Sequence, residues 1–148
     1  QKGSANREKA RLKLARLHYR IFCIREDVLH KITTEIAEEY AFVGIETLNV
    51  KGMMQNHRLA QALGDAAFGR FRKFLETKVA ASGGVVQPVG RLFPSSKRCH
   101  RCHEKRDDLT LAERVFVCPH CHLECDRDYN ASINILQEAI RLFESNLN

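Results

Sequence analysis

Four of the six cysteines in this chain of 148 residues form two pairs with the same spacing. Two residues separate the members of each pair and fifteen residues separate the pairs, which are Cys99 with Cys102 and Cys118 with Cys121. A gap of two residues lets one tight turn present both sulfurs to a single ion, and two such turns complete a tetrahedral site. The spacing therefore predicts a structural zinc ion bound by these four cysteines.

Other possible ligands surround the two pairs, and we prefer the four cysteines because both pairs are intact. The alternatives are His100, His103, His120, His122 and Cys125. His103 and His122 each follow the second cysteine of a pair, a position that commonly holds glycine because the backbone favours positive φ there. We expect Cys23 and Cys125 to be small buried residues and not ligands.

Acidic residues at the ends of two predicted elements are the second group of candidates. Asp126 and Asp128 open the last predicted helix, where aspartate favours helix capping and suits the helix dipole. Carboxylates on a rigid helix terminus also suit Mg²⁺ or Mn²⁺. Glu46 ends a short apolar run and is either a second metal ligand or an ordinary surface acid. The residues alone leave these interpretations open.

The charge of the chain is distributed unevenly around these candidates. The net charge is +6, but residues 51–105 contain eleven Lys or Arg and three acidic residues, whereas residues 106–148 contain four basic and eight acidic residues. A basic middle followed by an acidic end indicates a polyanionic partner beside a site that contains carboxylates. The alternative interpretation is solvated surface charge.

Periodicity predicts the elements that position these residues. They are a helix over residues 4–40, a strand over 41–45, a turn at 48–52, a helix over 65–81 that ends at Gly83 and Gly84, a strand over 85–89 and a helix over 130–142. The order strand, helix, strand, cysteine module, helix is typical of an α/β fold. Pro88 predicts that the second strand lies at an edge or ends early.

The first predicted helix is unusually long for a chain of this size. Residues 4–40 contain no proline or glycine, and apolar residues from Leu14 to Ile36 recur at spacings of three and four. Such a helix forms a rod of roughly 55 Å, which exceeds what a small domain can cover. We therefore expect that the helix is broken in two or packs on something outside this chain.

Two apolar patterns predict core residues on the later helices. On the helix over residues 65–81 we expect the core to contain Ala66, Phe68, Phe71, Phe74 and Leu75. On the last helix we expect Ile133, Leu136, Ile140 and Phe143 to face inward.

Composition and hydropathy exclude several classes of protein. Hydrophobic residues make up 44% of the chain and charged residues 28%, which is typical of a soluble globular protein and not of collagen-like, mucin-like or disordered chains. The longest uncharged run has twelve residues, between Lys78 and Arg91, whereas a membrane span needs roughly 20. The first residues lack the apolar stretch of a secretion signal. We therefore expect a cytoplasmic protein with no membrane partner.

The chain resembles the TnpB (OrfB) family of transposon-associated proteins, which is related to type V CRISPR effectors. The resemblance covers nearly the whole chain as an ordered set of motifs. These are Ser4-x-Asn6-Arg7-x-Lys9-Ala10, Arg25-Glu26-Asp27-x-x-His30-Lys31, Ile45-Glu46-x-Leu48-Asn49-Val50-x-Gly52-Met53, Asp65-Ala66-Ala67-Phe68-Gly69, Phe93-Pro94-Ser95-Ser96-Lys97-x-Cys99 and Asp126-Arg127-Asp128-x-Asn130-Ala131.

The resemblance implies an α/β fold that is a partial RNase H-like (RuvC) domain with a long N-terminal helix and an inserted four-cysteine zinc ribbon. It divides the chain into a RuvC-like part over residues 1–92, the ribbon over 93–124, and the last RuvC-like segment with its closing helix over 125–148. The implied activity is RNA-guided cleavage of DNA during transposition and DNA recombination.

The resemblance also implies roles for the acidic residues. Family catalysis uses three carboxylates on two divalent ions, here Mg²⁺ or Mn²⁺, which activate water and stabilise the leaving oxygen. Glu46 matches the second carboxylate and Asp128 the third, with Asp126 as the alternative. The first lies on a strand before the long helix, and we expect this chain to begin after that strand. It is therefore predicted to be a fragment that is inactive alone.

The implied partners are DNA and a guide RNA. The residues predicted to bind nucleic acid are Lys51, Arg70, Lys73, Arg91, Lys97, Arg98 and Arg101. They would follow the nucleic-acid backbone and would read its charge and shape. The alternative function is a non-catalytic zinc-ribbon module that binds nucleic acid. A sheet that lacks its first strands would also expose an edge, which predicts possible self-association.

Overall fold

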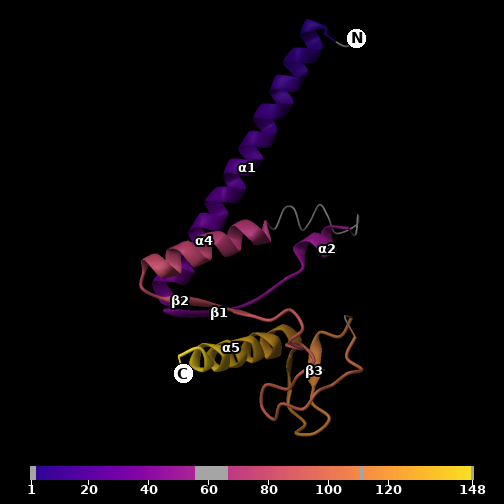
Figure 1. The fold of residues 1–148 in the computed structure, drawn as a ribbon. Coiled ribbons are helices and arrows are strands. Elements are labelled where there is room, and N and C mark those ends of the chain that lie inside the picture. The colour runs from indigo at the N-terminus through magenta and orange to yellow at the C-terminus, as the bar shows by residue number, and fades with distance from the viewer. Residues whose placement is uncertain (1–2, 56–66, 111, 148) are drawn as a thin grey trace. The chain divides into compact units, whose positions relative to one another are not determined.

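The computed structural model of the chain describes residues 3–55, 67–110 and 112–147, and it mixes helices with short strands (Figure 1). The side chains of residues 51 and 54 are also outside the description. The elements are α1 (Ala5–Glu39), β1 (Phe42–Glu46), α2 (Val50–Met54), α4 (Phe68–Ala81), β2 (Val85–Val89), β3 (Val115–Val117), β4 (Glu124–Asp126) and α5 (Arg127–Ser145).

The chain folds as two compact units. One contains Gln1–Glu39 and Val50–Ser82, and the other contains Tyr40–Asn49 and Gly83–Asn148. The predicted division at residues 92/93 and 124/125 stays a prediction. Among the described residues, no helix is both long enough and apolar enough to cross a membrane.

Helix α1 runs without interruption for 35 residues, so the predicted break is wrong. The Ser4 hydroxyl accepts a hydrogen bond from the Arg7 N–H at 3.3 Å, which caps the first turn. Most of the predicted apolar stripe lies in solvent, with Leu14 and Ile24 each 55% exposed. Only the last turns have a buried side, at Thr33 and Ala37, so packing on something outside the chain remains the prediction for the rest.

The buried residues of helix α4 are Leu75 and Val79, and this helix belongs to the same compact unit as α1. The ring of Phe74 stacks on His30 with 4.1 Å between centroids. The helix ends at Ala81 with Ser82 as its C-cap, and Gly83 follows with a φ of +78°, in line with the predicted end at Gly83 and Gly84.

Several predictions for this unit are refined by the structure. The turn predicted at residues 48–52 is wrong in part, because α2 begins at Val50. Phe68 and Phe71 are half-buried. Asp65 and Ala66, predicted for the start of the second helix, lie outside the described residues.

Strands β1 and β2 form a parallel pair in register from Phe42 opposite Val85 to Glu46 opposite Val89. Parallel strands need a long crossover connection, and residues 47–84 supply it. Within the described residues β2 pairs only with β1, so it is an edge strand and continues past Pro88. Of the two expectations for Pro88, the edge position is confirmed and the early end is wrong.

Helix α5 packs on β1 and β2 (Figure 1). A Cβ atom added at Gly44 would meet Ala139 Cβ at 2.9 Å, so only glycine fits in this strand position without displacement. Phe143 makes an edge contact with Phe42, with 5.5 Å between centroids. Glu46 follows Gly44 by two residues and ends the strand.

The buried face of α5 differs from the predicted apolar face. Leu136 and Ile140 are 44% and 40% exposed, so their predicted inward position is wrong, whereas Ile133 and Phe143 are half-buried. The buried residues of α5 are Asn130, Asn134 and Ala139. A two-stranded sheet covers only a narrow stripe of the helix, and the first turns face a loop whose polar backbone groups need hydrogen-bond partners.

The cysteine module contains the antiparallel strands β3 and β4. Phe116 of β3 is fully buried and packs with Leu109, Cys99 and Cys118. Cys125 is half-buried against this cluster. Cys23 lies in α1 and is exposed, so its predicted burial is wrong, because the helix face that carries it has no described cover.

Candidate functional site

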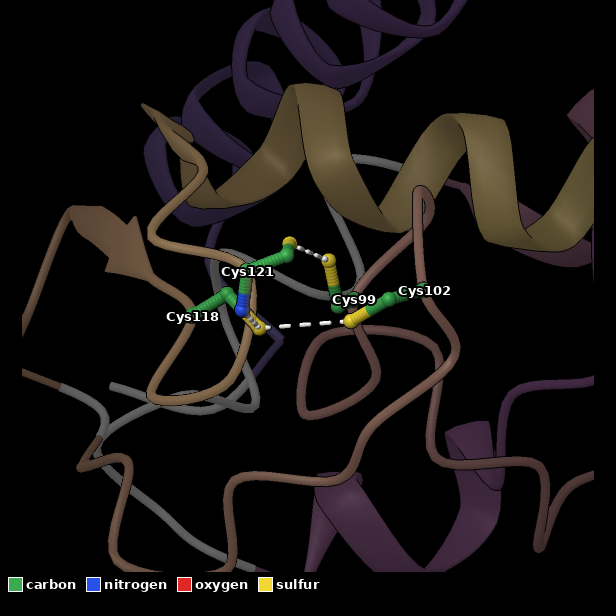
Figure 2. A group of neighbouring side chains, drawn as sticks. All are labelled: Cys99, Cys102, Cys118 and Cys121. Atoms are coloured by element: carbon green, nitrogen blue, oxygen red, sulfur yellow. Dashed lines mark hydrogen bonds between the residues drawn. The ribbon is translucent and has the colours of Figure 1, made fainter.

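The structure brings the four predicted metal-binding cysteines together. Their sulfur atoms all lie within 4.8 Å of one another, with Cys99 Sγ at 3.6 Å from Cys121 Sγ and Cys102 Sγ at 3.5 Å from Cys118 Sγ (Figure 2). Zinc–sulfur bonds of about 2.3 Å in a tetrahedral site place the sulfurs roughly 3.8 Å apart. The spacing therefore fits a metal ion held by four thiolates.

The two cysteine turns have the same backbone hydrogen bonds. In each turn the N–H of the first cysteine donates to the carbonyl five residues later, and its own carbonyl accepts from the N–H four residues later. The bonds are Cys99 N to Glu104 O at 2.8 Å, His103 N to Cys99 O at 2.9 Å, Cys118 N to Leu123 O at 2.9 Å and His122 N to Cys118 O at 3.1 Å. Because each turn satisfies its own backbone, the sulfurs are positioned locally.

The histidines near the cysteines are not part of the ligand cluster in the described structure. His103 and His122 have φ values of +66° and +57°, which confirms the positive φ expected after each second cysteine. The His100 ring bonds to Asn130 with 3.0 Å between Nδ1 and Oδ1. The ligand cluster of the described residues contains cysteines alone.

The cysteines differ in how readily they ionise. Burial raises the pKa of the Cys118 thiol, but hydrogen bonds from the backbone of Cys121 and His120 outweigh it and lower the pKa to about 6. At Cys102 a backbone hydrogen bond from Glu104 favours the thiolate, whereas burial and the neighbouring thiols raise the pKa to about 12. A bound cation would remove this conflict because it favours all four thiolates together.

A second candidate site is a cavity that contains both Glu46 and Asp128. The cavity has a volume of about 230 Å³. Its remaining lining consists of Ser95, Ser96, Lys97, Leu109, Thr110, Arg127 and Ala131. Glu46 comes from the end of β1 and Asp128 from the first turn of α5, so tertiary packing brings the two carboxylates to one cavity.

Two arginine side chains lie close to the Asp128 carboxylate. Its Oδ1 lies 3.3 Å from Arg127 Nη2 and its Oδ2 lies 3.9 Å from Arg114 Nη1. The Asp128 side chain is 72% exposed, so these pairs are accessible to water and ions. Carboxylates and cations on one cavity wall can bind a divalent cation together with a phosphate group.

Asp126 has a different position from Asp128. Its Oδ1 accepts hydrogen bonds from the Asp128 N–H at 2.8 Å and the Tyr129 N–H at 2.9 Å, which makes it the N-cap of α5. It is not among the residues that line the cavity. The two aspartates therefore differ in position: Asp126 caps the helix, whereas Asp128 lines the cavity.

The basic residues of the first unit that are predicted to bind nucleic acid differ in their contacts and exposure. The Arg70 guanidinium pairs with Glu26 at 2.7 Å and lies over the Phe22 ring, 4.7 Å from its centroid. Lys73 is exposed. The side chain of Lys51 is outside the described residues.

In the second unit Arg91 and Arg101 are exposed. Lys97 lines the carboxylate cavity, and its Nζ donates to the Asp107 carbonyl at 2.7 Å. Arg98 is half-buried over the Phe93 ring, 5.8 Å from its centroid. No contact in the structure tests whether these residues bind nucleic acid, so that role stays a prediction.

Three amide side chains of α5 lie beside the site but are not among the predicted site residues. Asn130, Asn134 and Gln137 lie on one helix face and bond to the backbone of residues 95–100, which leads into the first cysteine turn. Their spacing of four and three residues in the sequence places these polar side chains on one face of the helix, next to its apolar face.

Two family models match the chain. The one described as "Cas12f1-like, TNB domain" matches residues 68–135, and the one described as "Probable transposase" matches residues 1–57. A Streptomyces pristinaespiralis protein named "Putative RNA-guided DNA endonuclease" is 46% identical over 135 residues, which are 91% of this chain and 33% of that protein. An Escherichia coli K12 relative, "Putative RNA-guided DNA endonuclease InsQ", is 30% identical over 91% of this chain and 37% of its own length.

The solved structure of a Cas12f1–sgRNA–target DNA complex has a similar fold. The TM-score is 0.66 at 21% sequence identity, and the match covers 88% of this chain and 38% of Cas12f1. At this identity the likeness shows the fold alone. The chain spans about a third of the length of the relatives it matches, and it belongs to the TnpB (OrfB) family, as its motifs predicted.

Proposed function

We propose that this chain is the C-terminal part of a transposon-associated RNA-guided DNA endonuclease that hydrolyses phosphodiester bonds with divalent metal ions. The observation that carries the proposal is the cavity shared by Glu46 and Asp128. It is supported by relatives whose names describe RNA-guided DNA endonucleases.

In this proposal Glu46 and Asp128 bind Mg²⁺ or Mn²⁺ at the cavity. A bound divalent ion would supply a polarised water and charge stabilisation for the phosphodiester. Arg127 and Lys97 line the same cavity and would hold the phosphate oxygens. Asp126 is the weaker candidate because its carboxylate already accepts two backbone hydrogen bonds.

The proposed fold is a partial RNase H-like (RuvC) domain. Support comes from the parallel pair β1 and β2 with α5 packed on it and a carboxylate at the end of β1. Within the described residues the cavity lining contains two acidic side chains, whereas the resemblance implies three carboxylates. We therefore infer that this chain has little nuclease activity by itself.

The proposed cofactor of the four-cysteine cluster is structural zinc. The sulfur spacing and the absence of a histidine from the described cluster support this assignment. The proposed partners are DNA and a guide RNA, bound along exposed basic residues that include Lys73, Arg91 and Arg101. Self-association through the exposed edge of the β1–β2 pair remains a prediction.

A DNA cleavage assay tests the proposal. The chain is compared with a version extended by its upstream coding sequence, each with Mg²⁺ and the RNA from the transposon end. We expect cleavage by the extended version alone, and a loss of at least about a hundredfold in Glu46→Gln and Asp128→Asn, because metal ligands act as a unit.

Asp126→Asn is the matched control for Asp128→Asn. Asparagine caps helices as well as aspartate does, so this variant preserves α5 and removes only the charge. Cleavage retained in Asp126→Asn and lost in Asp128→Asn supports the assignment. The reverse pattern would assign the metal to Asp126 instead.

A second candidate function is a non-catalytic module that binds nucleic acid. The observation that favours it is the exposure of Arg101 and Lys105 on the cysteine module. If neither protein cleaves DNA but this chain binds a DNA duplex with an affinity that falls steeply with salt, the binding module is the correct function. Arg101→Ala should then reduce the salt dependence by about one counterion.

A further inference from the structure

The backbone on both sides of Cys99 is bound by one side chain of α5. Asn130 Nδ2 donates to the Arg98 carbonyl at 2.7 Å, and Asn130 Oδ1 accepts from the His100 N–H at 3.0 Å. Asn130 is fully buried. Because Arg98 and His100 flank the predicted metal ligand Cys99, this amide connects the ligand to the helix.

The connection continues along the helix. Asn134 Nδ2 donates to the carbonyls of Ser95 at 2.8 Å and Arg98 at 2.5 Å, and it is also buried. Gln137 Nε2 donates to the His100 carbonyl at 3.2 Å. Three side chains at successive turns of α5 therefore bind one short loop.

The same loop and the same helix line the carboxylate cavity. Ser95, Ser96 and Lys97 contribute to its wall, and Asp128 precedes Asn130 by two residues. Two residues along a helix correspond to a rotation of about 200° around its axis, so Asp128 and Asn130 lie on nearly opposite sides of α5. One side binds the loop that leads to Cys99, and the other faces the cavity.

We infer that Asn130 is a positioning residue that transmits metal binding at the four cysteines to Asp128. Metal bound by Cys99 fixes the adjacent peptide groups, these fix Asn130, and Asn130 fixes the first turn of α5. The cysteine module would then act as part of the carboxylate site as well as a separate structural unit. Asp126, which caps the same turn, is held from the other side by β4.

The first test follows the Asp128 carboxyl group by NMR in protein labelled with ¹³C-carboxyl aspartate. The chain has six aspartates, and Asp128→Asn assigns the Asp128 signal. We expect the signal to move when zinc is removed from the unaltered chain. In zinc-loaded Asn130→Ala we expect it to lie near its zinc-free position, whereas Ser132→Ala, an exposed change on the same helix, should match the unaltered chain.

A Co²⁺-substituted sample of each variant shows by its thiolate absorption that the four cysteines still bind metal. Because Asn130→Ala removes a buried group and can destabilise the module, Asn130→Ser is measured beside it. Serine keeps a small polar side chain at this position, has no amide N–H to donate to the Arg98 carbonyl and adds no aspartate signal to the spectrum. An unaltered Asp128 signal in a metal-loaded Asn130 variant, or after zinc removal from the unaltered chain, would overturn the inference.

A second measurement titrates each zinc-loaded protein with Mn²⁺ alone and detects free Mn²⁺ by electron paramagnetic resonance. We expect Asn130→Ala to weaken Mn²⁺ binding by roughly tenfold, the lower end of what loss of a residue that orients a metal ligand costs. This arm rests on the proposed function. If the unaltered chain binds no Mn²⁺, the carboxylate assignment fails, while the NMR signal still decides the role of Asn130.

Discussion

The four-cysteine cluster and the carboxylate cavity are adjacent to the same loop, but they are built in different ways. The cysteines lie on two turns that each satisfy their own backbone hydrogen bonds, within one stretch of the chain. The carboxylates come from β1 and α5, and only the packing of these elements brings them to one cavity. The comparison shows that a site fixed by local structure needs only one stretch of the chain, whereas a site fixed by tertiary packing depends on every element around it.

The largest expected effect is the loss of the metal from the cysteine cluster. Cys118→Ala should abolish tight zinc binding and unfold the module, because structural zinc contributes about 10 kcal/mol or more to such folds. Zinc content after gel filtration and hydrogen exchange of β3 and β4 measure the two effects. Cys23→Ser, a change at an exposed cysteine, is the control and should retain zinc. Retention of zinc in Cys118→Ala would show that the cluster is not the ligand set.

Gly44→Ala should damage the carboxylate site and leave the cysteine cluster intact. The added methyl group meets Ala139 Cβ at 2.9 Å, and overpacking of this kind costs about 1–3 kcal/mol. Urea unfolding measures the cost, and Co²⁺ absorption confirms that the thiolate site persists. Gly90→Ala is the matched control because an added Cβ there meets nothing within 4 Å. Equal stability of the two variants would mean that α5 does not pack on β1 as closely as the structure shows.

The two aspartates at the start of α5 should differ in their effect on stability. Asp126→Ala removes the helix cap and should destabilise the chain by about 1 kcal/mol. Asp128→Ala removes an exposed carboxylate and should change stability by less than about 0.5 kcal/mol. Thermal unfolding followed by circular dichroism compares them. If Asp128→Ala is the more destabilising, its carboxylate has a structural role that the proposed function does not include.

The smallest expected effect is a gain in the affinity of the cysteine cluster. His103→Gly relieves a positive φ of 66°, which costs a residue with a Cβ about 1 kcal/mol, so zinc should bind up to about fivefold more tightly. Competition with a chromophoric chelator measures this change. His120→Gly lies in the second turn at a position without positive φ and should give no gain. An equal gain in both variants would point to a general effect of glycine.

The sequence predicted the elements that depend on local patterns. The long helix, the strands that became β1 and β2, and the end of α4 just before Gly83 follow from apolar periodicity and glycine placement. The clustering of the four cysteines and the positive φ at His103 and His122 follow from spacing in the same way. These features require only residues that are close in the chain.

The tertiary structure decided the features that depend on what each face meets. The apolar residues Leu136 and Ile140 remain exposed, while Asn130 and Asn134 are buried, because the loop before Cys99 offers unpaired backbone groups to that side of α5. Periodicity identifies an apolar face but not the polar partner that another face will find.

The separation of Asp126 from Asp128 also depended on the structure. By sequence both aspartates suited a helix cap or a metal site, and their types gave no basis for a choice. The start of α5 at Arg127 makes Asp126 the cap, and the packing of α5 on β1 brings Asp128 to the cavity with Glu46. The sequence by itself determined which residues could do chemistry, and the packing of distant elements decided which of them meet.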